Sequence, residues 1–279
     1  MKLNFTKMHG CGNDYIYFNC FNQLVNNPSA LSKKLSDRRY GIGGDGIILI
    51  CPSDVADAKM RMFNLDGSEG KMCGNGIRCV GKYLFDNKIV QSDEIKIETL
   101  SGIKTVKVLE NNGKADRLTV NMGKPELVAN RIPVNLNMDK VVNHKVSIGE
   151  EFYNVTCVSM GNPHCVVFCR RINAINLEKI GPIFENDKLF PEKVNTEFVE
   201  IVDEKTLNMR VWERGSGETL ACGTGACAVV VAAVLNGICK KNTDITVNLK
   251  GGTLTVRYCD DAVYMTGPAV KVFEGVVEI

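Results

Sequence analysis

Two cysteines, each followed at once by a Gly-x-Gly turn, are the residues best placed to do chemistry. Cys73 is followed by Gly-Asn-Gly and Cys222 by Gly-Thr-Gly, and an apolar segment rich in small residues follows each turn. We predict that each turn opens a buried helix with the cysteine at its N-terminus. Unpaired backbone N–H groups and the positive end of the helix dipole then face each sulfur. We therefore expect the pKa of each thiol to fall below its usual value of about 8.5.

The same two helix starts are suited to binding a carboxylate, because their N–H groups point outward and glycine allows a ligand to approach closely. If two such sites face one another, one thiolate can remove a proton from a carbon. The other thiol can then deliver a proton to the opposite face. This is the chemistry of a two-base racemase or epimerase, and it needs no cofactor when carbanion charge spreads into a held carboxylate. For either copy alone, a buried structural cysteine remains an equal alternative.

The two cysteine motifs belong to a longer internal repeat with an offset of 149 positions. Matched pairs at this offset include Met60 with Met209, Arg61 with Arg210, Glu69 with Glu218, Gly12 with Gly161 and Asn13 with Asn162. A repeat this long indicates two domains of one fold, in agreement with the length of 279 residues. We predict an N-terminal domain over 1–122, a C-terminal domain over 123–267, and a tail, 268–279, that returns to the first domain.

The positions of apolar residues predict that strands dominate both domains. Helices are expected over 28–40 and 175–186 and after each Cys-Gly-x-Gly motif. Residues 41–46 match the G-x-G-x-x-G pattern, but they follow a predicted helix and precede a predicted strand, which is the reverse of a dinucleotide site. We interpret them as a glycine loop. Strands are expected over 3–8, 15–19, 47–50, 59–64, 95–98, 105–109, 118–122, 152–158, 165–168, 196–202, 207–212, 245–249, 253–258, 262–265 and within 269–279.

Composition argues against several other classes of function. A net charge of +2 gives no strong field toward nucleic acid or membrane. The sequence shows no signal-peptide core and no uncharged apolar run of about 18 residues, so we expect a cytoplasmic location and no membrane span. The twelve cysteines are then expected to be thiols. With no C-x-x-C and three histidines, we expect no metal and no cofactor. The cysteines interpreted as small core residues are Cys20, Cys51, Cys157, Cys165, Cys169, Cys239 and Cys259.

Several motifs together resemble the diaminopimelate epimerase family. They are residues 7–14 (KMHGCGND), 63–69 (FNLDGSE), 72–79 (MCGNGIRC), 161–164 (GNPH) and 213–225 (ERGSGETLACGTG), in the expected order along the whole chain. The resemblance implies two similar α/β domains, each a β-barrel-like sheet around a central helix, with the active site between them. It implies conversion of LL-diaminopimelate to the meso form without pyridoxal phosphate, for lysine and cell-wall synthesis, by a homodimer.

The resemblance also implies roles for individual residues. Cys73 and Cys222 would be the acid/base pair, and His164 and Glu213 would assist the sulfurs or hold the substrate amine. Backbone N–H groups of Gly74, Asn75, Gly223 and Thr224 would bind the carboxylate of the reaction centre, and the remaining substrate contacts would come from Asn13, Asn64, Asn162, Asn195 and Arg214. Phe273 stands where relatives often have a tyrosine linked to dimerisation. We assign Arg78, Cys79 and Cys227 no role beyond the helix body.

Other classes of protein remain open at this point. A proline or hydroxyproline racemase has a similar architecture, but Glu213, Arg214 and the set of asparagines favour a longer substrate with a second amino-acid head. A thiol redox or metal-binding protein is a second alternative, weakened by the absence of C-x-x-C. A binding protein of the same fold without activity is a third, weakened by the presence of both cysteines.

Overall fold

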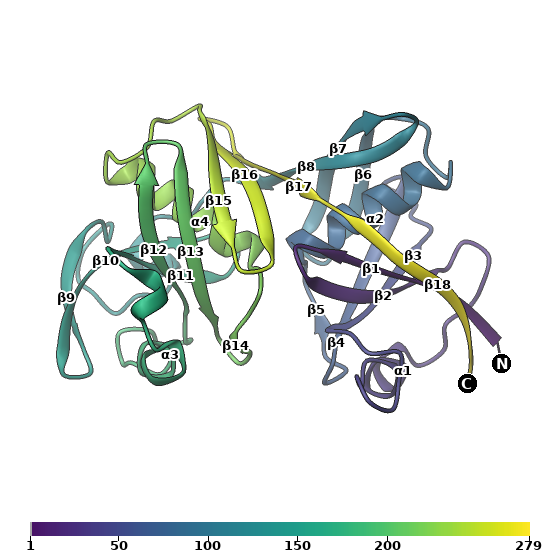
Figure 1. The fold of residues 1–279 in the computed structure, drawn as a ribbon, viewed down its shortest axis with the longest axis horizontal. Helices are drawn as coiled ribbons and strands as arrows, with labels where there is room; N and C mark the ends of the chain where they lie inside the picture. Colours follow the sequence, from purple (N-terminus) through teal and green to yellow (C-terminus); the bar gives the residue numbers. More distant parts are fainter. Residues whose placement is uncertain (1) are drawn as a thin grey trace. The chain divides into compact units, whose positions relative to one another are not determined.

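The computed structural model describes residues 2–279 and divides into two compact units (Figure 1). The described part of Met1–Asn121 forms the first unit together with Thr266–Ile279, and Met122–Met265 forms the second. Strands outnumber helices in both units. The predicted fold class, mixed α/β with two related domains, is confirmed. No helix within residues 2–279 is long and apolar enough to cross a membrane.

The elements follow the order expected of a duplicated fold. The first unit contains β1 (Lys2–Gly10), β2 (Asn13–Asn19), α1 (Pro28–Leu35), β3 (Gly46–Cys51), β4 (Ala58–Asn64), β5 (Glu69–Gly70), α2 (Gly74–Asp86), β6 (Glu94–Thr99), β7 (Gly102–Asn111), β8 (Lys114–Gly123) and β18 (Val270–Glu278). The second contains the short helices η1 (Ala129–Arg131) and η2 (Ile172–Ala174), and β9 (His144–Ile148), β10 (Glu151–Ser159), β11 (Pro163–Cys169), α3 (Leu177–Glu185), β12 (Asn195–Asp203), β13 (Thr206–Glu213), β14 (Gly217–Glu218), α4 (Gly223–Leu235), β15 (Asp244–Leu249) and β16 (Gly252–Tyr258). β17 (Val263–Pro268) begins in the second unit and ends in the first, and the last two residues of β8 lie in the second.

Strand pairing repeats between the two units with the offset seen in the sequence. In the first unit β2 pairs in parallel with β3, and Tyr15 lies opposite Gly46. In the second unit β11 pairs in parallel with β12, and His164 lies opposite Asn195. Tyr15 and His164 are 149 positions apart in the sequence, and so are Gly46 and Asn195. Equivalent residues of the two units can therefore be compared directly.

A buried helix is at the centre of each unit. In the second unit α4 packs against β10, β11, β12, β15 and β16, and Ala226 to Ala233 are all buried. A helix apolar on every side is stable only when protein surrounds it. In the first unit α2 packs against β1, β2, β6 and β7. Its Arg78 is fully buried and donates hydrogen bonds to the carbonyls of Gly74 and Pro268 and to Oδ1 of Asn75.

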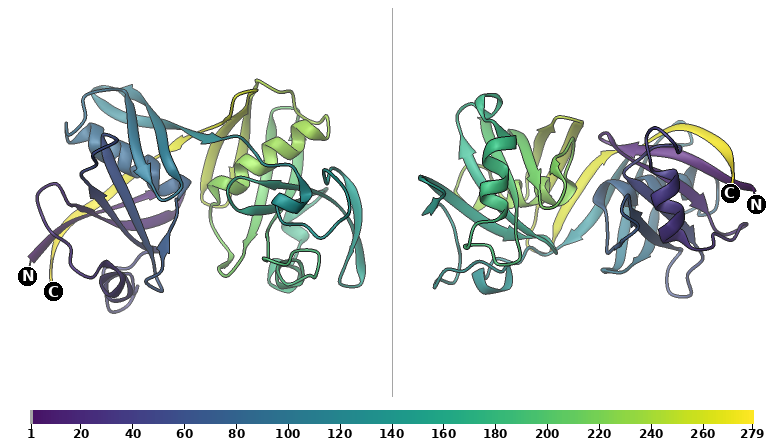
Figure 2. Two further views of the ribbon diagram at one scale, coloured as in Figure 1. Left: turned by 180° about the vertical axis from the view of Figure 1, so that it is seen from behind. Right: turned by 90° about the horizontal axis from the view of Figure 1, so that it is seen from below.

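The C-terminal strand completes the first unit. β18 pairs antiparallel with β1, from Lys2 opposite Glu278 to His9 opposite Val270. Figure 1 and both views of Figure 2 show the yellow strand running beside the purple one. The tail, which we expected to return to the first domain, forms β18 of the first unit.

The helix predicted over 28–40 is wrong in its second half. α1 ends at Leu35, because Oδ1 of Asp37 accepts hydrogen bonds from the backbone N–H groups of Arg39 and Tyr40. Such local side-chain bonds compete with helix continuation. Residues 41–45 form a loop that leads into β3, as predicted, and Gly46 is the first residue of the strand. β9 was not predicted, because its sequence, HKVSI, is short and half polar.

Candidate active site

Each motif cysteine is the N-cap residue of the central helix in its unit. Cys73 and Cys222 have extended backbone angles, and α2 and α4 each run for 13 residues after them. The sulfur of Cys73 accepts a hydrogen bond from the N–H of Gly76 at 3.3 Å. The sulfur of Cys222 accepts one from Gly225 at the same distance. The predicted helix starts are confirmed, and each sulfur lies at a helix N-terminus.

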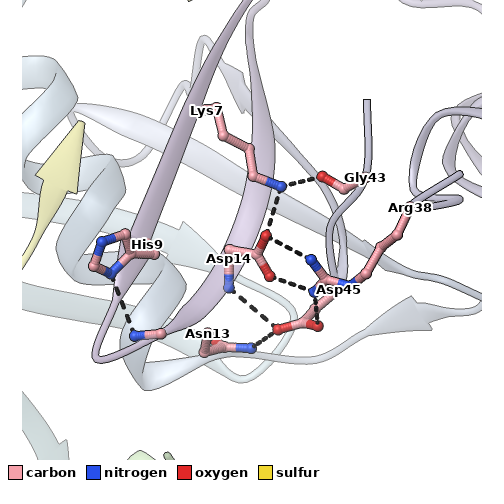
Figure 3. A network of polar contacts seen from close by, with 8 residues as sticks. Lys7, His9, Asn13, Asp14, Arg38, Gly43 and Asp45 are labelled. Atoms are coloured by element: carbon pink, nitrogen blue, oxygen red, sulfur yellow. Dashed lines mark hydrogen bonds and ion pairs between the residues drawn. The ribbon is translucent and has the colours of Figure 1, made fainter. Parts of the chain in front are cut away.

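Asn13 links Cys73 to a network of charged side chains. The thiol of Cys73 donates to Oδ1 of Asn13 at 3.3 Å. Figure 3 shows the network, in which Nδ2 of Asn13 donates to Oδ2 of Asp45 at 2.7 Å. Arg38 bridges Asp45 and Asp14. Asp45 therefore holds the amide of Asn13 in the orientation that presents its oxygen to the sulfur.

The anchor of this network is an ion pair on the inner side of β1. Lys7 is buried, lies 2.7 Å from Asp14, and also donates to the carbonyl of Gly43 in the glycine loop. Burial opposes ionisation of Asp14, but hydrogen bonds from Arg38 and Lys7 outweigh it and hold the pKa of Asp14 below its ordinary value. The network therefore ties the glycine loop to the turn that carries Asn13.

The other predicted side chains of the first unit form hydrogen bonds with residues close to them in the sequence. Nδ2 of Asn64 donates to Oγ of Ser68 at 3.0 Å. Asn75 is buried, and its Oδ1 accepts from Arg78 at 2.8 Å. The side chain of Asn75 thus stabilises the helix start, and its predicted role belongs to its backbone.

A buried chain of hydrogen bonds reaches Cys222 from the interior of the second unit. Nδ1 of His164 lies 2.7 Å from Oε1 of Glu197, and Nε2 lies 3.1 Å from Oδ1 of Asn162. Nδ2 of Asn162 donates to Oγ1 of Thr224 at 3.3 Å, and that hydroxyl lies 3.4 Å from the sulfur of Cys222. His164 and Glu197 are both fully buried.

Glu213 is the second carboxylate near Cys222. Its Oε1 accepts a 2.5 Å hydrogen bond from the hydroxyl of Thr219. Burial raises the pKa of Glu213, while hydrogen bonds from Thr219 and the Cys222 thiol act in the opposite direction. Glu213 is thus placed to accept a proton from Cys222.

The expected low pKa is wrong for Cys222. Burial raises the pKa of this thiol well above its usual value, and the carboxylates of Glu213 and Glu197 add to the effect. Hydrogen bonds from Thr224 and from the N–H of Gly225 lower it, but they are outweighed. The helix terminus therefore favours the thiolate, but it does not set the pKa of Cys222 alone.

Asn195 and Arg214 are joined through the backbone. Asn195 is buried; its Nδ2 donates to the carbonyl of Pro163 and its Oδ1 accepts from the N–H of Arg214. The guanidinium of Arg214 donates through Nη1 to the carbonyl of Glu192 at 2.9 Å. Asn195 therefore positions the backbone of Arg214, and the role predicted for each toward substrate stays a prediction.

The predicted site residues are divided between the two units. Asn13, Asn64, Gly74 and Asn75 belong to the first unit with Cys73, and Asn162, His164, Asn195, Glu213, Arg214, Gly223 and Thr224 belong to the second with Cys222. Phe273 lies apart on β18 and contacts the ring of Phe5 with the ring centroids 5.9 Å apart. Within residues 2–279, no cluster of three or more His, Cys, Asp or Glu side chains is arranged to hold a metal.

Three further residues of the site were not predicted, namely Asp45, Glu197 and Thr219. The repeat contains a signal for one of them. The position equivalent to Glu197 is Ile48, a fully buried residue. A glutamate at a position that is buried in the other copy indicates a carboxylate in the interior.

The two related units, each with a cysteine-capped central helix, define a class of two-domain fold that several solved structures share. Solved structures with this fold include a phenazine biosynthesis protein of the PhzF family from Bacillus anthracis (TM-score 0.74, 19% identity, 100% of both chains covered). They also include a hydroxyproline epimerase from Agrobacterium vitis (TM-score 0.68, 14% identity, 99% of this chain and 91% of that one). At these identities the likeness shows the fold alone.

Sequence comparison narrows the class to one family. The family model for diaminopimelate epimerase matches residues 5–128 and 156–272. Proteins named diaminopimelate epimerase are 55% identical in Acetivibrio thermocellus, over 99% of both chains, and 53% identical in Methanococcus maripaludis, over 99% of this chain and all of the other. The Bacillus subtilis protein of that name is 51% identical, over 99% of this chain and 98% of the other. The chain belongs to the diaminopimelate epimerase family and is an enzyme of the epimerase class.

Proposed function

We propose that this chain interconverts LL-diaminopimelate and meso-diaminopimelate, with Cys73 and Cys222 acting on opposite faces of one α-carbon. The single observation that carries the proposal is that both copies of the fold contain the same arrangement of a cysteine and a helix. Each copy places a cysteine sulfur at the N-terminus of a buried helix, within 3.3 Å of a backbone N–H. Family membership, at 51–55% identity to proteins named for this activity, supports the choice of substrate.

In the proposed reaction one thiolate takes the α-proton and becomes a thiol, while the other thiol gives its proton to the opposite face and becomes a thiolate. The carbon inverts, and the two sulfurs exchange protonation states. No electrons leave the substrate, so no redox partner is required. The reverse reaction restores the starting state, as expected for two-base acid/base catalysis.

The thiolate at Cys222 requires a base, because burial favours its thiol form. Glu213 fills this role, since its carboxylate is held by Thr219 and accepts from the Cys222 thiol. The first turns of α2 and α4 offer N–H groups to the reaction-centre carboxylate, which is where negative charge develops. These contributions replace the electron sink that a cofactor would otherwise supply.

The test is proton exchange at the α-carbon in deuterated water. Cys73→Ala and Cys222→Ala are each expected to abolish conversion of LL-diaminopimelate while the thermal melt stays cooperative. Cys20→Ala and Cys169→Ala serve as matched controls, because these half-buried thiols lie at the ends of β2 and β11, away from the helix starts. Turnover near the wild-type rate in either motif mutant would overturn the two-base mechanism.

We further propose that the enzyme acts in the cytoplasm as a homodimer, with Phe273 at the contact. The support is that four apolar side chains of β18 are exposed, namely Val270, Val272, Phe273 and Val276. Sedimentation analysis is expected to show a dimer for the wild type and a monomer for Phe273→Asp. A monomeric wild-type protein would refute the assembly without affecting the chemistry.

A further inference from the structure

The side chains packed against the two helix starts differ in chemistry. A Cβ added at Gly76 would lie 2.6 Å from Cδ1 of Ile48, and one added at Gly225 would lie 2.6 Å from Oε1 of Glu197. Ile48 and Glu197 occupy equivalent positions of the repeated fold, on β3 and β12. The second unit therefore has a carboxylate beneath its cysteine where the first has hydrocarbon.

A carboxylate at this position is costly. Glu197 has no solvent exposure, and its Oε2 has no hydrogen-bond partner among residues 2–279. Burial of a charge destabilises a protein unless a partner compensates for the lost hydration. The side chain that compensates here is His164, at 2.7 Å from Oε1. Since Ile48 shows that the fold accepts an apolar residue at this position, packing alone does not explain Glu197.

We infer that Glu197 is a positioning residue that fixes the direction of the hydrogen-bond chain ending on Cys222. The inference deepens the proposed function, and it rests on Cys222 being one of the two acid/base thiols. The chain runs from Glu197 through His164, Asn162 and Thr224 to the sulfur.

The direction follows from donors and acceptors. Both atoms facing the ring of His164 are acceptors, namely Oε1 of Glu197 and Oδ1 of Asn162. Each contact therefore needs a hydrogen, one between Nδ1 of His164 and Oε1 of Glu197 and one on Nε2 toward Asn162. A ring hydrogen on Nε2 then fixes Oδ1 of Asn162 toward His164 and Nδ2 toward Thr224.

The last contact of the chain places the hydroxyl of Thr224 as a hydrogen-bond donor to the sulfur of Cys222. Oγ1 of Thr224 accepts from Nδ2 of Asn162, so its own hydrogen is free to point at the sulfur of Cys222, 3.4 Å away. A hydroxyl that donates to sulfur stabilises the thiolate. In the first unit the equivalent asparagine, Asn13, presents its oxygen to Cys73 and so accepts from the thiol. The side-chain contact at the end of each asparagine-linked chain thus differs between the sulfurs, because Asn13 accepts from Cys73 whereas Thr224 donates to Cys222.

Replacement of Glu197 by glutamine distinguishes a positioning role of this residue from a direct electrostatic effect on Cys222. In Glu197→Gln the carboxylate that faces Nδ1 of His164 becomes an amide, which can donate as well as accept, so the direction of the chain is no longer enforced. Thiolate formation at Cys222 should then become harder. If Glu197 acted only as a nearby negative charge, its removal would instead make the thiolate easier to form. The sign of the change therefore decides between the two roles.

The experiment measures alkylation of Cys222 by iodoacetamide against pH, with peptide mass spectrometry, in wild type, Glu197→Gln and the control Glu200→Gln. Glu200 is a half-exposed residue of the same strand that contacts Asn208. We expect Glu197→Gln to slow alkylation of Cys222 about tenfold at a pH below its midpoint, which corresponds to a shift of about one pKa unit. Alkylation of Cys73, and of both cysteines in Glu200→Gln, should not change. Unchanged or faster alkylation of Cys222 in Glu197→Gln would overturn the inference.

A measurement on the wild type keeps the test independent of how well the variant folds. Nitrogen NMR of the histidine rings should show a proton on Nε2 of His164 at neutral pH. An unprotonated Nε2 would overturn the inference. Failure of the proposed function would appear separately, as retained activity in Cys222→Ala.

Discussion

Nδ2 of Asn13 donates a 2.7 Å hydrogen bond to Oδ2 of Asp45, and this contact decides which atom of the amide meets Cys73. A carboxylate can only accept, so Oδ1 of Asn13 is the atom left to face the thiol. Asp45→Asn can donate as well as accept and so permits the opposite orientation of the amide. We expect kcat/KM to fall about tenfold, the size of one lost charge-assisted bond. Steady-state kinetics would compare kcat/KM of Asp45→Asn with that of the control Asp37→Asn, which lies just after α1. Equal values in the two variants would contradict the role of Asp45.

Glu213 is expected to set the acid limb of the pH profile. Burial raises its pKa above the ordinary value of 4.5, and it must be ionised to accept the proton of Cys222. The rate should therefore fall as pH drops through this raised pKa, and Glu213→Gln should lose both the limb and most of the activity. If Glu213→Gln kept the acid limb of the wild-type pH profile, that limb would belong to another group.

The same shift predicts an effect on stability. A carboxyl whose pKa is raised by folding stabilises the protein below its unfolded pKa, and that contribution is lost as pH rises through the folded pKa. Glu213→Gln, which stays neutral, should melt at a higher temperature than wild type at about pH 8 and close to it at about pH 4. Melting curves at the two pH values would measure this, and an equal difference at both would reject the linkage.

Arg214→Lys tests whether the substrate carries a second amino-acid head. A guanidinium can bind a distal carboxylate with two parallel hydrogen bonds, whereas an ammonium is a point charge. Loss of one such bond is worth about 1.5–3 kcal/mol, so kcat/KM for diaminopimelate should fall about ten- to a hundred-fold. Unchanged kinetics would remove Arg214 from the site. Efficient racemisation of proline by the wild type would favour the rival substrate.

Gly225→Ala and Gly76→Ala form a matched pair. At Gly225 the new Cβ meets a carboxylate oxygen fixed by His164, and at Gly76 it meets the terminal methyl of Ile48, each at 2.6 Å. A methyl group can move by a rotamer change, but the hydrogen-bonded oxygen cannot move without loss of its partner. We expect Gly225→Ala to destabilise by about 1–3 kcal/mol and Gly76→Ala by less, as measured by urea unfolding. The reverse order would show that Glu197 is not held rigidly.

The cysteine-capped helices could be predicted because their signals are local and occur twice. A glycine turn before an apolar run specifies a helix start wherever it occurs, and the repeat at one offset removed chance as an explanation. The return of the tail to the first domain was predicted from its apolar, strand-like sequence, although its partner strand, β1, was not identified.

What was missed depends on contacts that no local pattern encodes. Glu197 lies in a run of strand residues where a charged side chain ordinarily faces solvent, and only its partnership with His164 explains its burial. Asp45 looked like one more polar residue of a glycine loop until the fold brought it to Asn13. The pKa of Cys222 was predicted in the wrong direction because the helix dipole can be read from sequence, whereas burial and two nearby carboxylates cannot.

The pairing of β18 with β1 also has a consequence for the order in which the chain folds during synthesis. The second unit is one continuous stretch, Met122–Met265, and all of it can leave the ribosome before β18 does. The first unit starts earlier but lacks the partner of β1 until Val270–Glu278 has emerged. Although translation runs from the N-terminus, we expect the second unit to reach its native state first. Until β18 has emerged, β1 of the nascent first unit lacks this partner strand.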